Sequence, residues 1–151
     1  MNILFFLTPK SDVAYLTDEM TLRQALEKME HHRYTCIPML DRNGRYVGTV
    51  TEGDLLWAVK NQYDLSVKNA EEVPILDVKR RRDYEPVNIN AKIEDMVFLA
   101  MGQNFVPVVD DRGAFIGIVT RKDIMRYCYD EYIVCLLYTS KHPLRQIGCY
   151  G

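Results

Sequence analysis

Two four-residue segments of the pattern T-x-x-D are the residues of this chain best suited to chemistry. The first runs from Thr51 to Asp54 and the second from Thr120 to Asp123. A threonine that precedes a helix accepts a hydrogen bond from the first turn, and a carboxylate three residues later favours the positive end of the helix dipole. A helix N-terminus also binds phosphate, and a carboxylate accepts hydrogen bonds from both hydroxyls of a ribose. The pattern therefore fits a helix cap alone, and equally a cap that also binds a nucleotide.

Both segments lie in an internal repeat of the 151-residue chain. Residues 38–54 align with residues 107–123 at an offset of 69 without gaps, and 7 of the 17 aligned pairs are identical. Unrelated segments would share roughly one. The identical pairs are Pro38/Pro107, Asp41/Asp110, Gly44/Gly113, Gly48/Gly117, Val50/Val119, Thr51/Thr120 and Asp54/Asp123. With two residues gapped, the repeat extends upstream at an offset of 71, which indicates a duplicated unit.

Each unit is predicted to contain a strand, a helix, a hairpin and a second helix. An extended lead-in ends near Leu16 in the first unit and near Val87 in the second. A helix follows in the first unit, with Thr21 and Gln24 as its capping box and an apolar face at the i, i+3, i+4, i+7 spacing. That face consists of Leu22, Ala25, Leu26 and Met29. Asn43-Gly44 and Arg112-Gly113 are the predicted hairpin turns.

The predicted fold class is α/β (α+β), with two β-α-β-β-α repeats packed sheet to sheet as a pseudo-twofold pair. A unit of about 60 residues buries too little surface to be stable alone, whereas two units share a core. We assign residues 1–64 to the first domain and residues 65–134 to the second, with the polar segment 61–72 as their connection. Residues 135–151 match nothing earlier, and the segment 135–140 resembles the translated end of a sequencing adapter, so this tail is left out of the functional argument.

Composition and charge narrow the function classes. The chain is 48% hydrophobic and 26% charged, with a formal net charge of −2, as expected of a globular protein rather than a nucleic-acid binder. No apolar run approaches the length of a membrane span, so we expect a cytoplasmic protein. The four cysteines have neither CxxC nor zinc-site spacing, which predicts no metal site and, with a buried reduced thiol at Cys36, a reducing compartment. The absence of HExxH, GxSxG and P-loop motifs argues against an enzyme.

The repeated motif resembles the CBS domain, the family named after cystathionine β-synthase. The segments that carry the resemblance are IPMLDRNGRYVGTVTEGD and VPVVDDRGAFIGIVTRKD, and the similarity covers about residues 6–130. The resemblance implies a pseudo-twofold pair with two clefts between its halves, commonly assembled into a dimer of pairs. It also implies an adenine ligand such as AMP, ADP or ATP, or a relative such as cyclic di-AMP or S-adenosylmethionine.

In this family the T-x-x-D segment of one unit works with the lead-in of the other, so the resemblance implies two different clefts. In the first cleft we expect cations beside the motif, and a small residue that lets the backbone approach the adenine. The expected ligand contacts of this cleft are Thr120, Arg121, Lys122, Asp123, Thr8, Lys10 and Ala14.

In the second cleft, Thr51 and Asp54 face the lead-in that contains the basic run 79–82 and the segment 84–86. Glu52 opposes a phosphate there, so charge would have to come from Lys79, Arg80 and Arg81. The alternative for this run is a solvated surface loop, as most charge runs are.

Two further contacts follow from the resemblance, because residues about three before the strand proline reach the ligand in the family. Here these residues are Thr35 and Asn104. The cationic segment 31–33, in contrast, is predicted to complement the C-terminus of the first helix.

We therefore expect a non-catalytic regulatory module that senses an adenine nucleotide and has no obligatory cofactor. The resemblance implies a homodimer as one partner. A separate effector protein is the other expected partner, because no effector domain is fused to the repeats. The alternatives are a ligand-free structural interaction module, and a sensor of cyclic di-AMP or S-adenosylmethionine.

Overall fold

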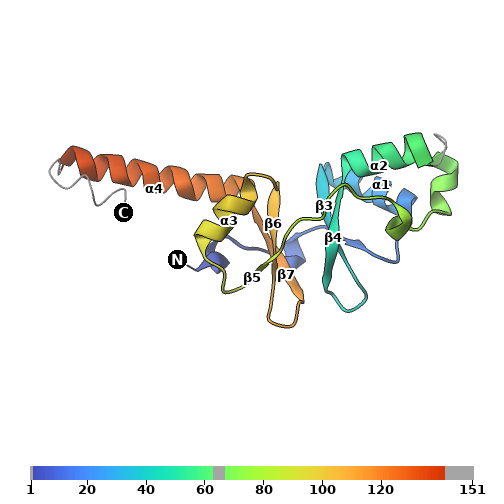
Figure 1. Cartoon of the computed structure of the whole chain (residues 1–151), viewed down its shortest axis with the longest axis horizontal. Helices are drawn as coiled ribbons and strands as arrows, with labels where there is room; N and C mark the ends of the chain where they lie inside the picture. The colour runs from blue at the N-terminus through green and yellow to red at the C-terminus, as the bar shows by residue number, and fades with distance from the viewer. Residues whose placement is uncertain (1, 63–66, 142–151) are drawn as a thin grey trace.

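The computed structural model describes residues 2–62 and 67–141 of the chain. It consists of two halves whose sheets lie toward the middle of the molecule, with helices on the outer sides (Figure 1). The first half contains β2 (Leu16–Thr17), α1 (Leu22–His32), β3 (Cys36–Leu40), β4 (Tyr46–Thr51) and α2 (Glu52–Trp57). The second half contains β5 (Val87–Asn88), α3 (Ile93–Ala100), β6 (Phe105–Val109), β7 (Phe115–Thr120) and α4 (Arg121–Lys141). The order β-α-β-β-α in both halves confirms the predicted fold class.

The two sheets share a strand arrangement but differ at one edge. In the first half the order is β2-β3-β4, and in the second it is β1-β7-β6-β5. In each half the first helix connects two strands that pair in parallel, β2 with β3 and β5 with β6. The pairs β3–β4 and β6–β7 are antiparallel hairpins. The extra strand β1 (Thr8–Pro9) comes from the start of the chain and pairs with β7, so the first half's lead-in completes the second half's sheet.

Short single-turn segments occupy the lead-ins and the connection. They are the 3-10 turns Ile3–Phe6, Lys10–Asp12, Val67–Glu71 and Ile75–Asp77, and the π-helical segment Ala58–Gln62 that follows α2.

Local sequence signals account for the ends of these elements. The Thr21 hydroxyl accepts the Gln24 N–H at 3.3 Å and Gln24 Oε1 accepts the Thr21 N–H at 2.9 Å, so the predicted capping box begins α1. Gly44 and Gly113 occupy the hairpin turns with φ of 78° and 81°, a backbone region that costs glycine little. Asp41 Oδ1 accepts the N–H groups of Asn43 and Arg45 at 2.8 and 2.9 Å, which closes the first turn. Both predicted turns are thus confirmed.

The connection between the halves packs on the first half. Ala70, Val73, Ile75 and Val78 are buried in the same core cluster as Leu16. The Leu22 N–H donates to the Val73 carbonyl at 2.8 Å. The predicted boundary between residues 64 and 65 lies outside the described residues, and residues 70–78, placed in the second domain by sequence, belong by packing to the first half's core.

The last helix extends well past the body of the second half (Figure 1). It runs from Arg121 to Lys141 without a break, so the boundary drawn at residue 135 falls inside α4. Only Ile124 is buried along it, and Tyr127 packs edge-on against the Phe6 ring at 5.4 Å. Within residues 2–62 and 67–141, no helix is both long enough and apolar enough to cross a membrane.

The cysteines of the described residues differ in state. Cys36 and Cys128 carry free thiols, and Cys36 is buried as predicted. Cys135 is disulfide-bonded, which departs from the expectation of a reducing compartment.

Candidate functional site

A cavity of about 330 Å³ lies between the two halves. Its size is within the range of small-molecule sites, about 300–1,000 Å³. The apolar part of its wall comes from both halves and consists of Val13, Tyr34, Cys36, Pro38, Phe105 and Ile118. The polar groups are Thr8, Thr35, Asn104 and Thr120, and the charged ones are Asp12 and Arg33. We call this cavity the open cleft.

The open cleft exists because each lead-in crosses to the other half. Thr8 pairs with Ile118 on β7, the strand that ends at Thr120. This pairing brings the segment from Thr8 to Val13 to the wall of the cleft that Thr120 also lines. The junction between α1 and β3 supplies Thr35 from the opposite side, and the junction between α3 and β6 supplies Asn104. The structure thus brings together four predicted contacts, and it does so through the crossed arrangement that the family resemblance implied.

Asp123 stands directly behind Thr120 at the start of α4. The Thr120 hydroxyl donates to Asp123 Oδ2 at 2.9 Å and accepts the Asp123 N–H at 3.2 Å. This reciprocal pair caps α4 and holds the Thr120 side chain at the wall of the open cleft.

Four of the predicted contacts of this cleft lie elsewhere. Lys10 stacks over the Tyr15 ring at 5.4 Å and lines a separate cavity of about 430 Å³ beside the Asn43-Gly44 turn. Arg121 Nε donates to the carbonyls of Ala100 and Gln103 at 2.8 and 3.1 Å, so its guanidinium caps the end of α3. Lys122 is exposed, and Ala14 packs against the first half's core.

Arg33 is the lining residue that sequence reasoning placed differently. It follows the last residue of α1 in the left-handed conformation, with φ of 58° and ψ of 34°. The sequence assigned the segment 31–33 to helix-end electrostatics, whereas the structure also places Arg33 on the wall of the open cleft. Arg33 precedes the predicted contact Thr35 by two residues, and this spacing could have indicated that Arg33 also lines the cleft.

A polar cluster at the wall of the open cleft links residues of the two halves. Cys36 Sγ accepts hydrogen bonds from Asn104 Nδ2 at 3.3 Å and from the Tyr84 hydroxyl at 3.6 Å. The Asn104 N–H in turn donates to the Tyr84 oxygen at 3.2 Å. Burial raises the pKa of Tyr84 above its ordinary value, so its proton is firmly held. Asn104 Nδ2 also lies 3.5 Å from the hydroxyl of Thr35, its counterpart in the first half.

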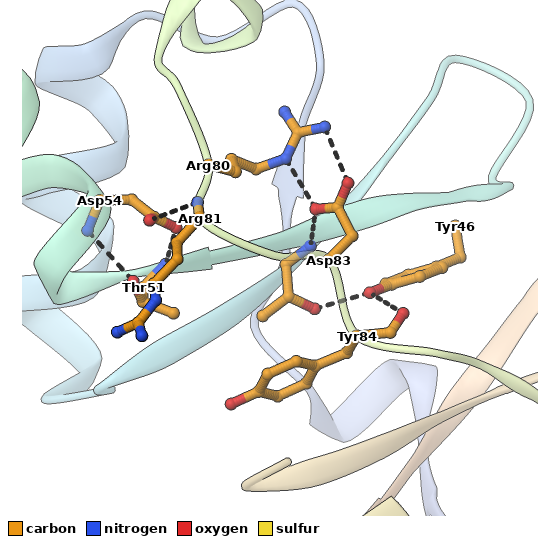
Figure 2. A network of polar contacts seen from close by, with 8 residues as sticks. Tyr46, Thr51, Asp54, Arg80, Arg81, Asp83 and Tyr84 are labelled. Atoms are coloured by element: carbon orange, nitrogen blue, oxygen red, sulfur yellow. Dashed lines mark hydrogen bonds and ion pairs between the residues drawn. The ribbon is translucent and has the colours of Figure 1, made fainter. Parts of the chain in front are cut away.

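The T-x-x-D segment of the first half, Thr51 to Asp54, is engaged in internal hydrogen bonds (Figure 2). Asp54 is 5% exposed. Its Oδ2 accepts the Thr51 N–H at 3.0 Å, and its Oδ1 accepts the Arg81 N–H at 3.1 Å. Thr51 completes the capping box by accepting the Asp54 N–H at 3.1 Å. Both oxygens of this carboxylate therefore already have backbone donors, one of them from the lead-in of the second half.

The basic run next to this segment is partly neutralised. Arg80 donates to the two carboxylate oxygens of Asp83 at 2.7 and 3.2 Å, and this hydrogen bond raises the Arg80 pKa (Figure 2). Asp83 also accepts the Thr49 N–H from β4 at 3.1 Å. Arg82 donates to the Gly102 carbonyl, and Lys79 is exposed. Two of its arginines are bonded within the protein, so the run is not wholly solvated, and these two side chains are not free to bind phosphate.

A half-buried tyrosine, Tyr46, fixes the same lead-in to the first half. The Tyr46 hydroxyl donates to the Tyr84 carbonyl at 2.9 Å and lies 2.7 Å from Thr49 Oγ1 (Figure 2). Burial raises the Tyr46 pKa well above its ordinary value, against the opposing effect of the Thr49 hydrogen bond.

Comparison with known proteins agrees with this architecture. The CBS domain family matches residues 6–61 and residues 75–130, and the chain belongs to that family. The CbpB protein of Listeria monocytogenes, solved in complex with c-di-AMP, is 24% identical and has a TM-score of 0.76, over 87% of this chain and 96% of that one. CBSX2, solved in complex with AMP, is 25% identical with a TM-score of 0.69, over 85% of this chain and 96% of that one.

Among curated proteins, a homoserine O-acetyltransferase of Methanohalophilus mahii is 33% identical over 114 residues. The match covers 75% of this chain and 22% of the enzyme, so the chain corresponds to about a fifth of that relative's length.

Proposed function

We propose that this CBS pair is a regulatory module that binds an adenine nucleotide in the open cleft. The observation that carries the proposal is the 330 Å³ cavity between the halves, where Thr8, Thr35, Asn104 and Thr120 meet. A relative of the same fold, CBSX2, is solved with AMP, and it is 25% identical over most of both chains.

The composition of the cleft suits each part of a nucleotide. Val13, Phe105 and Ile118 provide apolar surface for the faces of an adenine ring. Asp123, next to Thr120 at the start of α4, is the proposed acceptor for the ribose hydroxyls. Arg33 is the proposed phosphate partner, as a guanidinium forms strong charge-assisted hydrogen bonds with phosphate oxygens.

The charges of the lining favour a monophosphate. Arg33 contributes one positive charge and Asp12 one negative charge, so the lining residues carry no net charge. A triphosphate would bring several negative charges close to Asp12 with one guanidinium to offset them. We therefore propose AMP ahead of ADP and ATP.

Binding at this position would report to a partner through the relative orientation of the halves. A ligand in the open cleft would lie against Arg33 and Thr35 from the first half and Asn104 and Thr120 from the second, because these residues line the cavity. A ligand shifts a conformational equilibrium by its differential affinity for the two states, so a nucleotide that bridges both halves favours one orientation. A separate effector protein in the cytoplasm is the proposed reader.

The test is a thermal-shift screen of the full chain against AMP, ADP, ATP, cyclic di-AMP, S-adenosylmethionine and GTP. A ligand at 100 times its dissociation constant adds about 2.7 kcal/mol of stability. Thr120→Val and Thr51→Val form a matched pair, since each removes a helix cap worth about 1 kcal/mol. We expect the AMP-dependent shift to disappear in Thr120→Val and to persist in Thr51→Val. If no nucleotide shifts the transition at millimolar concentration, the proposal is wrong.

A second candidate is a structural dimerisation module, which the exposed apolar side chains on and beside the helices support. Leu56, Trp57, Phe98 and Met101 are 58%, 54%, 73% and 78% exposed. We propose that they contribute to a homodimer, which is compatible with nucleotide sensing. Light scattering after size-exclusion chromatography tests the dimer: a monomeric mass at micromolar concentration contradicts it.

A further inference from the structure

The two lead-ins place residues of very different size at equivalent positions. At the 71-residue offset of this part of the repeat, Val13 in the first lead-in corresponds to Tyr84 in the second. Val13 lines the open cleft. Tyr84 is 8% exposed, so its phenol ring lies inside the protein rather than at its surface.

The neighbours of Tyr84 are the counterparts of the residues that line the open cleft. Its ring packs edge-on against Phe105 at 5.0 Å, and its hydroxyl bonds Cys36 Sγ and the Asn104 N–H. At the 69-residue offset, Phe105 corresponds to Cys36 and Asn104 to Thr35, and all four residues line the open cleft. Tyr84 thus packs against a wall that the two clefts share, at the position that Val13 occupies in the open cleft.

The polar end of the second cleft is closed by the same lead-in. The Arg81 N–H is bonded to Asp54, and the Asp83 carboxylate lies on β4 beside Thr49. These contacts hold the backbone that precedes Tyr84, and the Tyr46 hydroxyl donates to the Tyr84 carbonyl (Figure 2). The backbone of Tyr84 is therefore anchored as well as its hydroxyl.

We propose that Tyr84 is a built-in plug of the second cleft, so that this pair binds one nucleotide per chain. The stoichiometry rests on the proposed function, whereas the closure of the cleft by Tyr84 does not. The plug also bonds Cys36 and Asn104, which belong to the wall of the open cleft. The side chain that closes one cleft thus helps to shape the other.

The test combines titration calorimetry with AMP as the probe and a crystal structure. We expect one site per chain for the native protein, and one for Tyr84→Phe, which keeps the ring. Val13→Tyr, the mirror-image change, is expected to abolish binding. Tyr84→Val is expected to open a cavity in the second cleft and to add a second, weaker binding event, because Asp54 remains bonded to the Arg81 N–H.

The outcomes separate this inference from the proposed function. Two sites per native chain would overturn the plug and leave nucleotide binding intact. Absence of AMP binding to the native protein would count against the proposed function, while the Tyr84→Val crystal structure would still decide whether the cleft opens. A second cleft that stays filled in that crystal structure overturns the plug. If Tyr84→Val fails to fold, the native stoichiometry and Val13→Tyr decide the question.

Discussion

Gly48 lies directly against the carboxylate of Asp83, so closely that a Cβ atom on Gly48 would overlap Asp83 Oδ1. Gly117, its counterpart in the repeat, has the same relation to the backbone carbonyl of Thr8. In each half, the glycine of the second hairpin strand leaves space for the lead-in that crosses from the other half. This close approach explains why both copies of the motif contain glycine at that position.

The first prediction concerns this contact. Gly48→Ala should destabilise the protein by about 1–3 kcal/mol, the usual cost of overpacking a close contact. Urea denaturation followed by circular dichroism measures the change. Combination with Asp83→Ala should cost less than the sum of the two single changes, because the overlapping carboxylate is gone.

Gly53→Ala is the matched control for that substitution. Gly53 lies inside α2, and the nearest atom to a Cβ there is Thr51 Oγ1 at 3.7 Å, an ordinary contact distance. Alanine should stabilise α2 by up to about 1 kcal/mol because it is the better helix former. Equal effects of the two substitutions would contradict the packing argument.

The second prediction separates two arginines with different roles. Arg33→Gln should weaken AMP binding by about ten-fold, or about 1.4 kcal/mol, with little change in stability, since Arg33 is an exposed residue on the wall of the open cleft. Arg121→Gln should lower stability by about 1.5–3 kcal/mol, because its charged hydrogen bonds to Ala100 and Gln103 are lost. Calorimetry and urea denaturation measure the two effects.

The reverse pattern would assign phosphate contact to Arg121, as the family resemblance implied. A loss of AMP affinity in Arg121→Gln at unchanged stability is the result that would do so.

The third prediction is a loss of stability at alkaline pH. Burial raises the pKa of Tyr46 and of Tyr84 in the folded protein, whereas tyrosines of the unfolded chain ionise near pH 10. Above about pH 10 the folded state therefore holds more protons than the unfolded state. The free energy of unfolding should fall by up to about 1.4 kcal/mol per pH unit for each such tyrosine while it stays protonated in the folded state, and these groups add no slope well below pH 10.

Urea denaturation between pH 8 and pH 11.5 tests this pH dependence. Tyr46→Phe should be less stable at neutral pH, because its hydrogen bonds to the Tyr84 carbonyl and Thr49 are lost, and its stability should fall less steeply above pH 10. Parallel curves for the native protein and Tyr46→Phe would show that Tyr46 does not contribute to the alkaline transition.

The fourth prediction uses Cys36 and Cys128, the free cysteines of the described part of the chain. Cys36 is 8% exposed and lines the open cleft, whereas Cys128 is exposed on α4. Iodoacetamide should therefore alkylate Cys128 rapidly and Cys36 slowly, and saturating AMP should slow Cys36 further by covering it. Peptide mass spectrometry follows each site separately, with Cys128 as the internal control. An unchanged Cys36 rate in AMP would contradict binding over this wall.

Local signals in the sequence were sufficient for much of the fold. The 69-residue repeat identified two equivalent units, and the periodic apolar positions of residues 22–29 located α1. The capping box at Thr21 and the glycine turns at Gly44 and Gly113 formed as predicted. Each of these features depends on neighbours within a few residues, so type and spacing alone determine them.

The site was predictable only in part. The crossed lead-ins and four residues that line the open cleft, among them Thr8 and Thr120, followed from the repeat and its family resemblance. The directions of the Lys10 and Arg121 side chains could not be predicted in this way. Lys10 lies over the Tyr15 ring, and Arg121 donates to the Ala100 carbonyl at the end of α3.

The sequence by itself determined that two matching halves exist and that each carries a Thr and an Asp at the start of a helix. Only the tertiary structure decided that the halves are unequal. In one cleft Val13 leaves a cavity, and in the other Tyr84 packs against Phe105 and bonds Cys36 and Asn104. The physical reason is that occupancy of a cleft depends on side-chain volume among residues far apart in the chain, which become neighbours only when the halves pack.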